Sequence, residues 1–229
     1  MVAAPPRTVL DDVVVAPLRR RHLRGVLAVE HAVYPRPWTP ALFTSELSQR
    51  DSRRYFVALA PVAPARRMVV GYAGMMVAVG EAHVTTVAVH PAHHRRKLAS
   101  RLLVALLDSA RAMGAHAATL EVRLANRGAQ RLYSGFGFAP VGVRSGYYAE
   151  TGEDALIMWA HDLQGEAFSE RLETQRARLD APGGASGAPD LPVPWVRGRV
   201  GLDGPTGPYI PAPDERAAPR RATPGPQEA

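Results

Sequence analysis

A glutamate and a tyrosine in the second half of the chain have the chemistry and the setting for proton transfer. Glu121 lies between Leu120 and Val122 in an apolar run typical of a strand. A lone glutamate in such a strand usually faces solvent. If it lines a cleft instead, burial raises its pKa and makes it a general base near neutral pH. Tyr133 follows in a short helical pattern, where its phenol is a candidate general acid.

A basic loop between a predicted strand and a predicted helix is the second candidate site. The β-branched run 84–89 ends at His90-Pro91, because proline lacks a ladder donor and disfavours helix in the residue before it. Apolar residues recur at helical spacing from Leu98 onward. Unpaired backbone N–H groups and the positive end of the helix dipole meet at such a helix start, so the loop 93–99 is a candidate anion site. Ordinary α/β structure with solvated arginines is the alternative.

The elements that must position these residues follow from hydrophobic periodicity, which predicts an α/β chain. Strands are expected at 13–15, 55–60, 68–79, 81–89, 117–122, 139–148 and 155–161. Helices are expected at 19–33, 41–49, 98–113 and 126–135. Thr39-Pro40, a cap followed by proline at the first helical position, predicts the start of the second helix. The proline-rich segment 34–40, which carries Tyr34 and Trp38, is expected either to pack as a lid or to wall a substrate groove.

Composition excludes several classes of protein. The chain has no cysteine, which rules out disulfides, thiolate metal sites and a cysteine nucleophile. No apolar run reaches the roughly 18 residues of a membrane span, and the first residues lack the blocks of a signal peptide. We therefore expect a soluble, cytoplasmic protein that does not bind membranes. The net charge of +7 rests almost wholly on arginine, since only one of the 28 basic residues is lysine. That bias weakens an argument for direct nucleic-acid binding.

The chain is expected to comprise a domain at 1–163 and a C-terminal extension at 164–229. Residues 164–179 could form a short charged helix. Beyond them proline and glycine dominate, and such a sequence buries too little apolar area to offset the entropy of ordering. We predict a disordered or loosely docked tail there; Trp195, Tyr209 and Ile210 leave a partner-binding segment as the alternative.

Two motifs resemble the signatures of the GCN5-related N-acetyltransferases (GNAT). The stretch 120–138 matches Leu-Glu-Val-x-x-x-Asn-x-x-Ala-x-x-Leu-Tyr-x-x-x-Gly-Phe at every specified position. The loop resembles the pyrophosphate signature Gln/Arg-x-x-Gly-x-Gly/Ala, with His94, Lys97 and Ala99 in its three slots. Lys97 departs from the pattern, because glycine lets the backbone approach phosphates closely. We expect Lys97 to preserve the site only with an ordinary helix-start backbone and a side chain that points away.

Three further stretches make the chain similar to the ribosomal-protein-alanine N-acetyltransferase (RimI-type) branch over roughly residues 10–163. They are Tyr34-Pro-x-Pro-Trp38, Gly146-Tyr147-Tyr148 and Glu153-Asp-Ala-Leu-x-Met158. The resemblance implies a mixed, mostly antiparallel sheet whose fourth and fifth strands splay apart, with flanking helices. It also implies acetyl-CoA as acetyl donor and a protein N-terminus as acceptor, usually that of a small-subunit ribosomal protein.

The resemblance further implies a role for each motif residue. Glu121 would be the base and Tyr133 the acid. The pantetheine arm would pair with the backbone of Val87, Ala88 and Val89, one of whose N–H groups would also bind the oxyanion. The nucleotide end of acetyl-CoA would contact Arg95, Arg96, Lys97, Leu98, Ala99 and Ser100, and Asn126 would also contact the cofactor. The acceptor would lie near Tyr34, Trp38, Tyr147 and Tyr148.

Several alternatives stay open at this point. Asn126 could be only an N-cap. The acceptor could be a small amine or a lysine side chain, and the protein could be a non-catalytic acetyl-CoA-binding scaffold. No metal site is expected, because the histidines at 83, 90, 93, 94 and 116 have no convergent carboxylates and more plausibly are solvated or act as caps. The sequence does not decide the oligomeric state.

Overall fold

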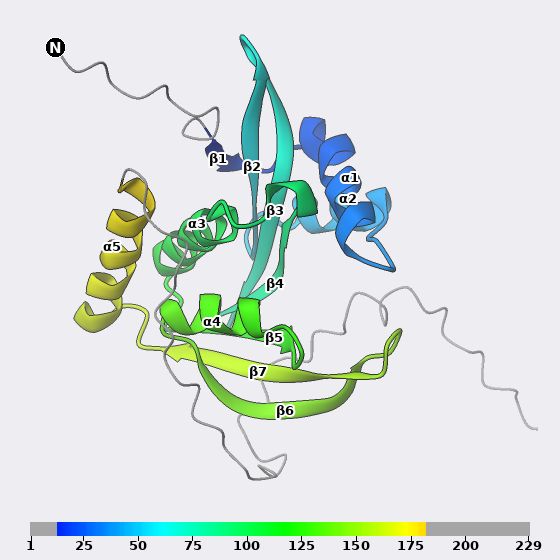
Figure 1. Cartoon of the computed structure of the whole chain (residues 1–229). Coiled ribbons are helices and arrows are strands. Elements are labelled where there is room, and N and C mark those ends of the chain that lie inside the picture. The colour runs from blue at the N-terminus through cyan, green and yellow to red at the C-terminus, as the bar shows by residue number, and fades with distance from the viewer. Residues whose placement is uncertain (1–12, 182–229) are drawn as a thin grey trace, which may run out of the picture.

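The computed structural model describes residues 13–181, which form one seven-stranded sheet with helices on both faces (Figure 1). The strand order is β1-β2-β3-β4-β5-β7-β6. The strands are β1 Val14–Pro17, β2 Arg53–Ala63, β3 Arg66–Ala78, β4 Glu81–Val89, β5 Ala117–Arg123, β6 Ala139–Tyr148 and β7 Glu153–His161. All neighbours are antiparallel except β4 and β5. The predicted mixed, mostly antiparallel sheet is confirmed.

The described chain has five α-helices, four of which lie where hydrophobic periodicity predicts them. They are α1 Leu23–Val33, α2 Pro40–Ser48, α3 Leu98–Ala112, α4 Arg127–Gly135 and α5 Glu166–Asp180. The start of α2 has the predicted chemistry, since the Thr39 side chain accepts a hydrogen bond from the Leu42 N–H and Pro40 occupies the first helical position. None of these helices is long and apolar enough to cross a membrane.

Strands β4 and β5 separate after a short parallel contact. Their pairing covers only Glu81–His83 of β4, and the rest of β4 pairs with β3 alone. A β-bulge lies at Thr85, which falls between the partners of Gly74 and Met75. Because a bulge bends the bulged strand and increases its twist, it directs the second half of β4 away from β5. Figure 1 shows the result: β2–β4 run steeply, whereas β5–β7 cross below them. The predicted splay is confirmed.

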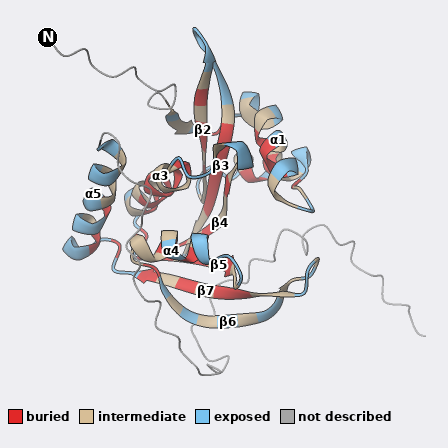
Figure 2. Cartoon of the chain, viewed as in Figure 1, coloured by how far each residue is buried: buried red, intermediate tan, exposed pale blue. Residues whose placement is uncertain are grey.

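Alternate residues of the central strands pack on opposite faces of the sheet, as the two-residue period of a strand requires. On one face Ala58 and Ala73 join a large core with the buried side of α3. On the other face Val57 and Tyr72 join a smaller core under α1 and α2. In Figure 2 the buried residues follow the middle strands and the helix sides that face them. Helices therefore cover the central strands on both faces. This packing fixes the place where β4 separates from β5.

Helix α5 packs on the same core as the rest of the sheet and lies against α3. Phe168 and Leu172 are buried in the α3-side core. The Arg111 guanidinium donates to Ser169 Oγ at 2.6 Å, and Arg176 forms an ion pair with Asp108 of α3. The division at residue 163 stays a prediction, and the expected tail beyond 181 lies outside the described residues.

Candidate active site

A cavity of about 190 Å³ occupies the place where β4 and β5 separate. It is walled by β4, β5, α4, the segment after α1 and the end of the β6–β7 hairpin. The predicted site residues that line it are Tyr34, Trp38, Val87, Glu121, Asn126, Tyr133, Tyr147 and Tyr148. The predicted base, acid and acceptor-side residues therefore meet in one cavity. The predicted phosphate-loop residues 95–100, together with Ala88 and Val89, are not among its lining residues.

Glu121 projects from β5 into this cavity and is paired on both sides. Its side chain is only 9% exposed. Oε2 lies 3.2 Å from His83 Nε2, and Oε1 lies 3.2 Å from an Arg144 guanidinium nitrogen. Burial raises the pKa of Glu121, and the positive charge of Arg144 partly opposes that rise. The result is a carboxylate that takes up a proton more readily than an exposed glutamate and is held in a fixed orientation.

His83 and Arg144 are site residues that the sequence analysis missed. His83 was expected to be a solvated or capping histidine, but it lies against Glu121, so that expectation is wrong. The reason is register: His83 is the last β4 residue paired with β5, opposite Thr119, which places it beside the neighbouring Glu121. Arg144 reaches the same carboxylate from β6, across β7. Only the strand order brings these groups together, and no local sequence signal reveals it.

Tyr133 is buried on α4, and its ring packs edge-on against Phe138 with centroids 6.0 Å apart. Burial raises the pKa of its phenol, and the nearby Tyr34 and Tyr148 raise it further. The phenol therefore stays protonated throughout the physiological range. Within residues 13–181 no hydrogen bond engages its hydroxyl, so the proton is available to a group that enters the cavity.

The aromatic pair Tyr147 and Tyr148 is held by Arg123, a third residue that the sequence analysis missed. Its guanidinium carbon lies 3.8 Å from the centre of the Tyr148 ring. The same guanidinium forms ion pairs with Glu150, in the hairpin turn, and with Glu153, at the start of β7. Tyr147 packs edge-on against Tyr148 with centroids 5.1 Å apart. These contacts fix two of the aromatic rings that line the cavity.

The backbone beside the cavity fits an extended amide-containing arm. Val87, Ala88 and Val89 pair with β3 on one side, and β5 no longer pairs with them on the other. A strand edge of this kind binds extended amide groups by main-chain hydrogen bonds. Val89 O already contacts His94 Nε2 at 2.9 Å, which folds the following loop back onto the strand end.

In the loop before α3, the backbone conformation of Lys97 differs from the one we expected. Its backbone is left-handed, with φ +56° and ψ +16°, and not an ordinary helix start. Arg95 is also left-handed, with φ +62°. The side chain does point away: Lys97 Nζ donates to the backbone oxygen of Arg178 in α5 at 2.7 Å. Lysine thus adopts the conformation that glycine favours, and the contact with α5 compensates for part of the backbone strain.

The amide N–H groups at the start of α3 and the left-handed turns before it form the kind of backbone concavity that binds anions. Arg101, one turn into the helix, donates to Leu179 O at 2.8 Å. Lys97 and Arg101 therefore cap the carboxyl end of α5 with positive charge, a favourable arrangement for a helix dipole. Asn126 accepts a hydrogen bond from the Ala129 N–H at 3.0 Å, so it does serve as the N-cap of α4.

The sequence profile of the acetyltransferase (GNAT) family matches residues 23–138, which span half of the chain. The chain belongs to the GNAT family. A Bacillus subtilis relative named as a putative ribosomal protein bS18-alanine N-acetyltransferase is 32% identical over 142 residues, which cover 62% of this chain and 91% of the relative. The N-alpha-acetyltransferase RimI of Mycobacterium tuberculosis is 39% identical over 127 residues, which cover 53% of this chain and 74% of the relative.

Solved GNAT structures agree with this assignment. The ribosomal-protein-S18-alanine N-acetyltransferase of Escherichia coli has a TM-score of 0.58 at 27% identity, covering 66% of this chain and 94% of that one. A chain of the NatC complex, solved with a Gag peptide and CoA, has a TM-score of 0.57 at 18% identity and shares the fold. The protein is therefore an acyltransferase that uses acetyl-CoA, as the resemblance implied.

Proposed function

We propose that this enzyme transfers the acetyl group of acetyl-CoA to the N-terminal amine of a protein, most simply an N-terminal alanine of a small-subunit ribosomal protein. The observation that carries this proposal is the meeting of Glu121 and Tyr133 in one cavity at the splay of β4 and β5. Two relatives and one solved structure whose names specify ribosomal-protein alanine support the choice of acceptor.

Glu121 has the properties that the first half of the reaction needs. An α-ammonium group, with a pKa of about 7.7–8.0, is mostly protonated at neutral pH and cannot attack a carbonyl. A buried carboxylate with a raised pKa removes that proton directly or through a water molecule. His83 and Arg144 hold the carboxylate in place while it does so.

Tyr133 serves the second half of the reaction. Acetyl-CoA supplies an activated thioester, and transfer forms the N–C bond of the amide while the C–S bond breaks. Tyr133 gives its proton to the departing sulfur, for which its buried and protonated phenol is suited. A backbone N–H of Val87, Ala88 or Val89 stabilises the negative charge that develops on the carbonyl oxygen. Residues Arg95–Ser100 would hold the nucleotide end, and Asn126, which lines the cavity, would contact the cofactor.

The acceptor would enter over the aromatic walls of the cavity. Tyr34 and Trp38, from the segment after α1, and Tyr147 and Tyr148, from the end of β6, all line it. Trp38 is buried, with only 8% of its surface exposed, so it shapes the wall more than it offers a contact surface. The narrow cavity suits a free chain end with a small first side chain.

The test is an acceptor panel. The full chain is incubated with acetyl-CoA and peptides that begin with Ala, Ser, Met or Gly, with an N-blocked lysine peptide and with small amines, while free thiol is followed. We expect thiol release with the N-terminal peptides, fastest with Ala. Transfer only to lysine or to small amines would replace the proposed acceptor, and cofactor binding without transfer to any acceptor would favour a scaffold.

A further inference from the structure

Glu30 is a buried carboxylate on the cavity wall that the acid–base pair described above does not use. It lies on the inner side of α1, is 1% exposed and lines the cavity. Within residues 13–181 it makes no ion pair. Two hydrogen bonds hold it instead: the Trp38 N–H donates to Oε2 at 2.6 Å, and the Tyr72 hydroxyl donates to Oε1. A carboxylate buried without a cation is costly unless it can take up a proton.

A line of hydroxyl groups connects Glu30 to the acceptor side of the cavity. Thr86 Oγ1 donates to the Tyr72 hydroxyl at 3.4 Å, and the Tyr34 hydroxyl lies 3.2 Å from Thr86 Oγ1. Tyr72 in turn donates to Glu30. With Tyr34 as donor to Thr86, every hydrogen bond points the same way, from Tyr34 towards the carboxylate. Tyr34 and Thr86 line the same cavity as Glu121.

The reaction takes two protons from the acceptor nitrogen, one before attack and one after it. The later proton is balanced within the site, because Tyr133 gives a proton to the sulfur and has to recover one. The earlier proton has to be taken by a base before the amine can attack. Glu121 can be that base, and the line of hydroxyl groups makes Glu30 a second one.

We propose that Glu30 is a second acceptor, beside Glu121, for the proton that leaves before attack, and that it is reached through the hydroxyl groups of Tyr34, Thr86 and Tyr72. The inference rests on the proposed function. The ammonium N–H bond breaks and its proton passes to Tyr34, while Tyr34 passes its own proton to Thr86, Thr86 to Tyr72, and Tyr72 to Glu30 Oε1. The three hydroxyls keep their proton count, the amine becomes neutral, and the Glu30 carboxylate becomes a neutral acid. Glu121 is then available for the proton released after attack, which replaces the one that Tyr133 gives to the sulfur.

The surroundings of Glu30 suit this exchange. Burial raises its pKa to about 7, and the hydrogen bond from the Trp38 N–H partly opposes the rise. The titratable groups that face it are Tyr72 from β3 and Tyr34 beyond the end of α1. The residue of β4 that belongs to the relay, Thr86, is uncharged. The buried carboxylate of α2, Glu46, contacts Arg53 and Tyr55 instead. A pKa near 7 lies close to that of an α-ammonium group, so the proton can pass in either direction.

The experiment compares Glu30→Gln and Tyr72→Phe with wild type in the full chain. Initial rates on an Ala-starting peptide are followed by thiol release from pH 6 to 9.5. We expect kcat to fall about 10-fold or more near pH 7 in both variants, within the range for one acid–base group. The deficit should shrink above pH 9, where the amine is already neutral, and KM for acetyl-CoA should stay close to wild type. Tyr72→Phe breaks the relay but keeps the bond between Trp38 and Glu30.

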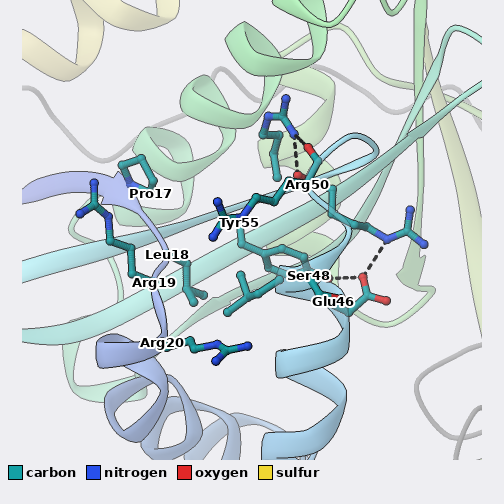
Figure 3. A pocket seen from close by; sticks show the side chains of 11 residues that line it. Pro17, Leu18, Arg19, Arg20, Glu46, Ser48, Arg50 and Tyr55 are labelled. Atoms are coloured by element: carbon teal, nitrogen blue, oxygen red, sulfur yellow. Dashed lines mark hydrogen bonds and ion pairs between the residues drawn. The ribbon is translucent and has the colours of Figure 1, made fainter.

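A matched control comes from a second buried carboxylate–phenol pair. The Tyr55 hydroxyl donates to Glu46 Oε2 at 2.8 Å, beside a different cavity of about 860 Å³ (Figure 3). Glu46→Gln should therefore leave the pH profile unchanged, and thermal melting checks the folding of all three variants. A deficit in Glu30→Gln and Tyr72→Phe that is equal at every pH would show a structural role and overturn the relay. So would wild-type profiles in both variants. A wild type that acetylates no N-terminal peptide would instead overturn the proposed function.

Discussion

The two ends of the proposed acetyl-CoA site, which we call the acyl end and the phosphate end, are built in different ways. The acyl end uses buried side chains from separate strands, with Glu121 held between His83 and Arg144. The phosphate end uses backbone groups at a helix start, and its departure from the family pattern, Lys97, is stabilised by a contact with α5. A side chain that carries chemistry cannot be replaced without loss of activity. A site made of backbone groups tolerates a different residue when another element supports the same backbone conformation.

The largest effect is expected at the acyl end, for Glu121→Gln. The amide has a similar size and cannot accept the proton, so kcat should fall by about 10²–10⁴, while the affinity for acetyl-CoA stays near that of wild type. Steady-state kinetics with an Ala-starting peptide and calorimetric titration with CoA would measure the two quantities. Glu46→Gln is the control, because Glu46 is also buried and paired with an arginine. A Glu121→Gln variant as active as that control would contradict the assignment of Glu121 as the base.

Tyr133→Phe should have the next largest effect, a loss of about 10²-fold in kcat. The raised pKa of this phenol keeps it protonated, so its removal should lower the rate without adding or removing an ionisation from the pH profile. Rates measured with thioesters of more and less acidic thiols sharpen the test, since a good leaving group needs less protonation. An equal loss for all the thiols would contradict the assignment of Tyr133 as the acid.

Replacing Arg144 should shift the pH profile and affect the maximal rate less. Arg144 lowers the pKa of Glu121, so Arg144→Gln raises that pKa and leaves the base more protonated at low pH. The acidic limb of kcat/KM should move to higher pH, by a modest amount because Arg144 is partly exposed. Arg176→Gln, whose partner Asp108 lies on α3, serves as control. A shift to lower pH would contradict the electrostatic account.

The smallest effect is expected at the phosphate end, from a pair of substitutions at Lys97. Lys97→Ala removes the contact with Arg178 and keeps a left-handed non-glycine backbone, whereas Lys97→Gly removes both the contact and the strain. Glycine should therefore leave the protein more stable than alanine by about 1 kcal/mol. Guanidinium unfolding of the two variants measures the difference. An alanine variant as stable as the glycine variant would show that the backbone at this position is not strained.

The sequence predicted the fold well because strand and helix periodicities are local. All seven described strands and the four helices up to α4 lie close to the expected ranges. The separation of β4 and β5 was predicted from the resemblance alone. Its physical basis is a bulge at Thr85, which hydrophobic periodicity does not reveal. The packing of α5 on α3 depends on contacts far apart in the chain, such as that of Arg111 with Ser169.

The candidate site was predictable where a sequence motif carries its residues. Glu121 and Tyr133 belong to a single continuous stretch, and the structure places both at one cavity. Their partners could not be predicted, because His83 depends on the β4–β5 register and Arg144 on the order of the last two strands. Glu30 was hidden for a similar reason: a glutamate at helical spacing on α1 has no signal until Tyr72 is placed opposite it.

The most direct test of the account locates the acetyl group itself. An Ala-starting peptide that also contains a lysine is incubated with acetyl-CoA and either wild type or Glu121→Gln, and tandem mass spectrometry identifies the acetylated nitrogen. The account predicts acetylation of the α-amine by wild type and a rate lower by about 10² or more with the variant. Acetyl on the lysine, or equal rates for the two proteins, would contradict it.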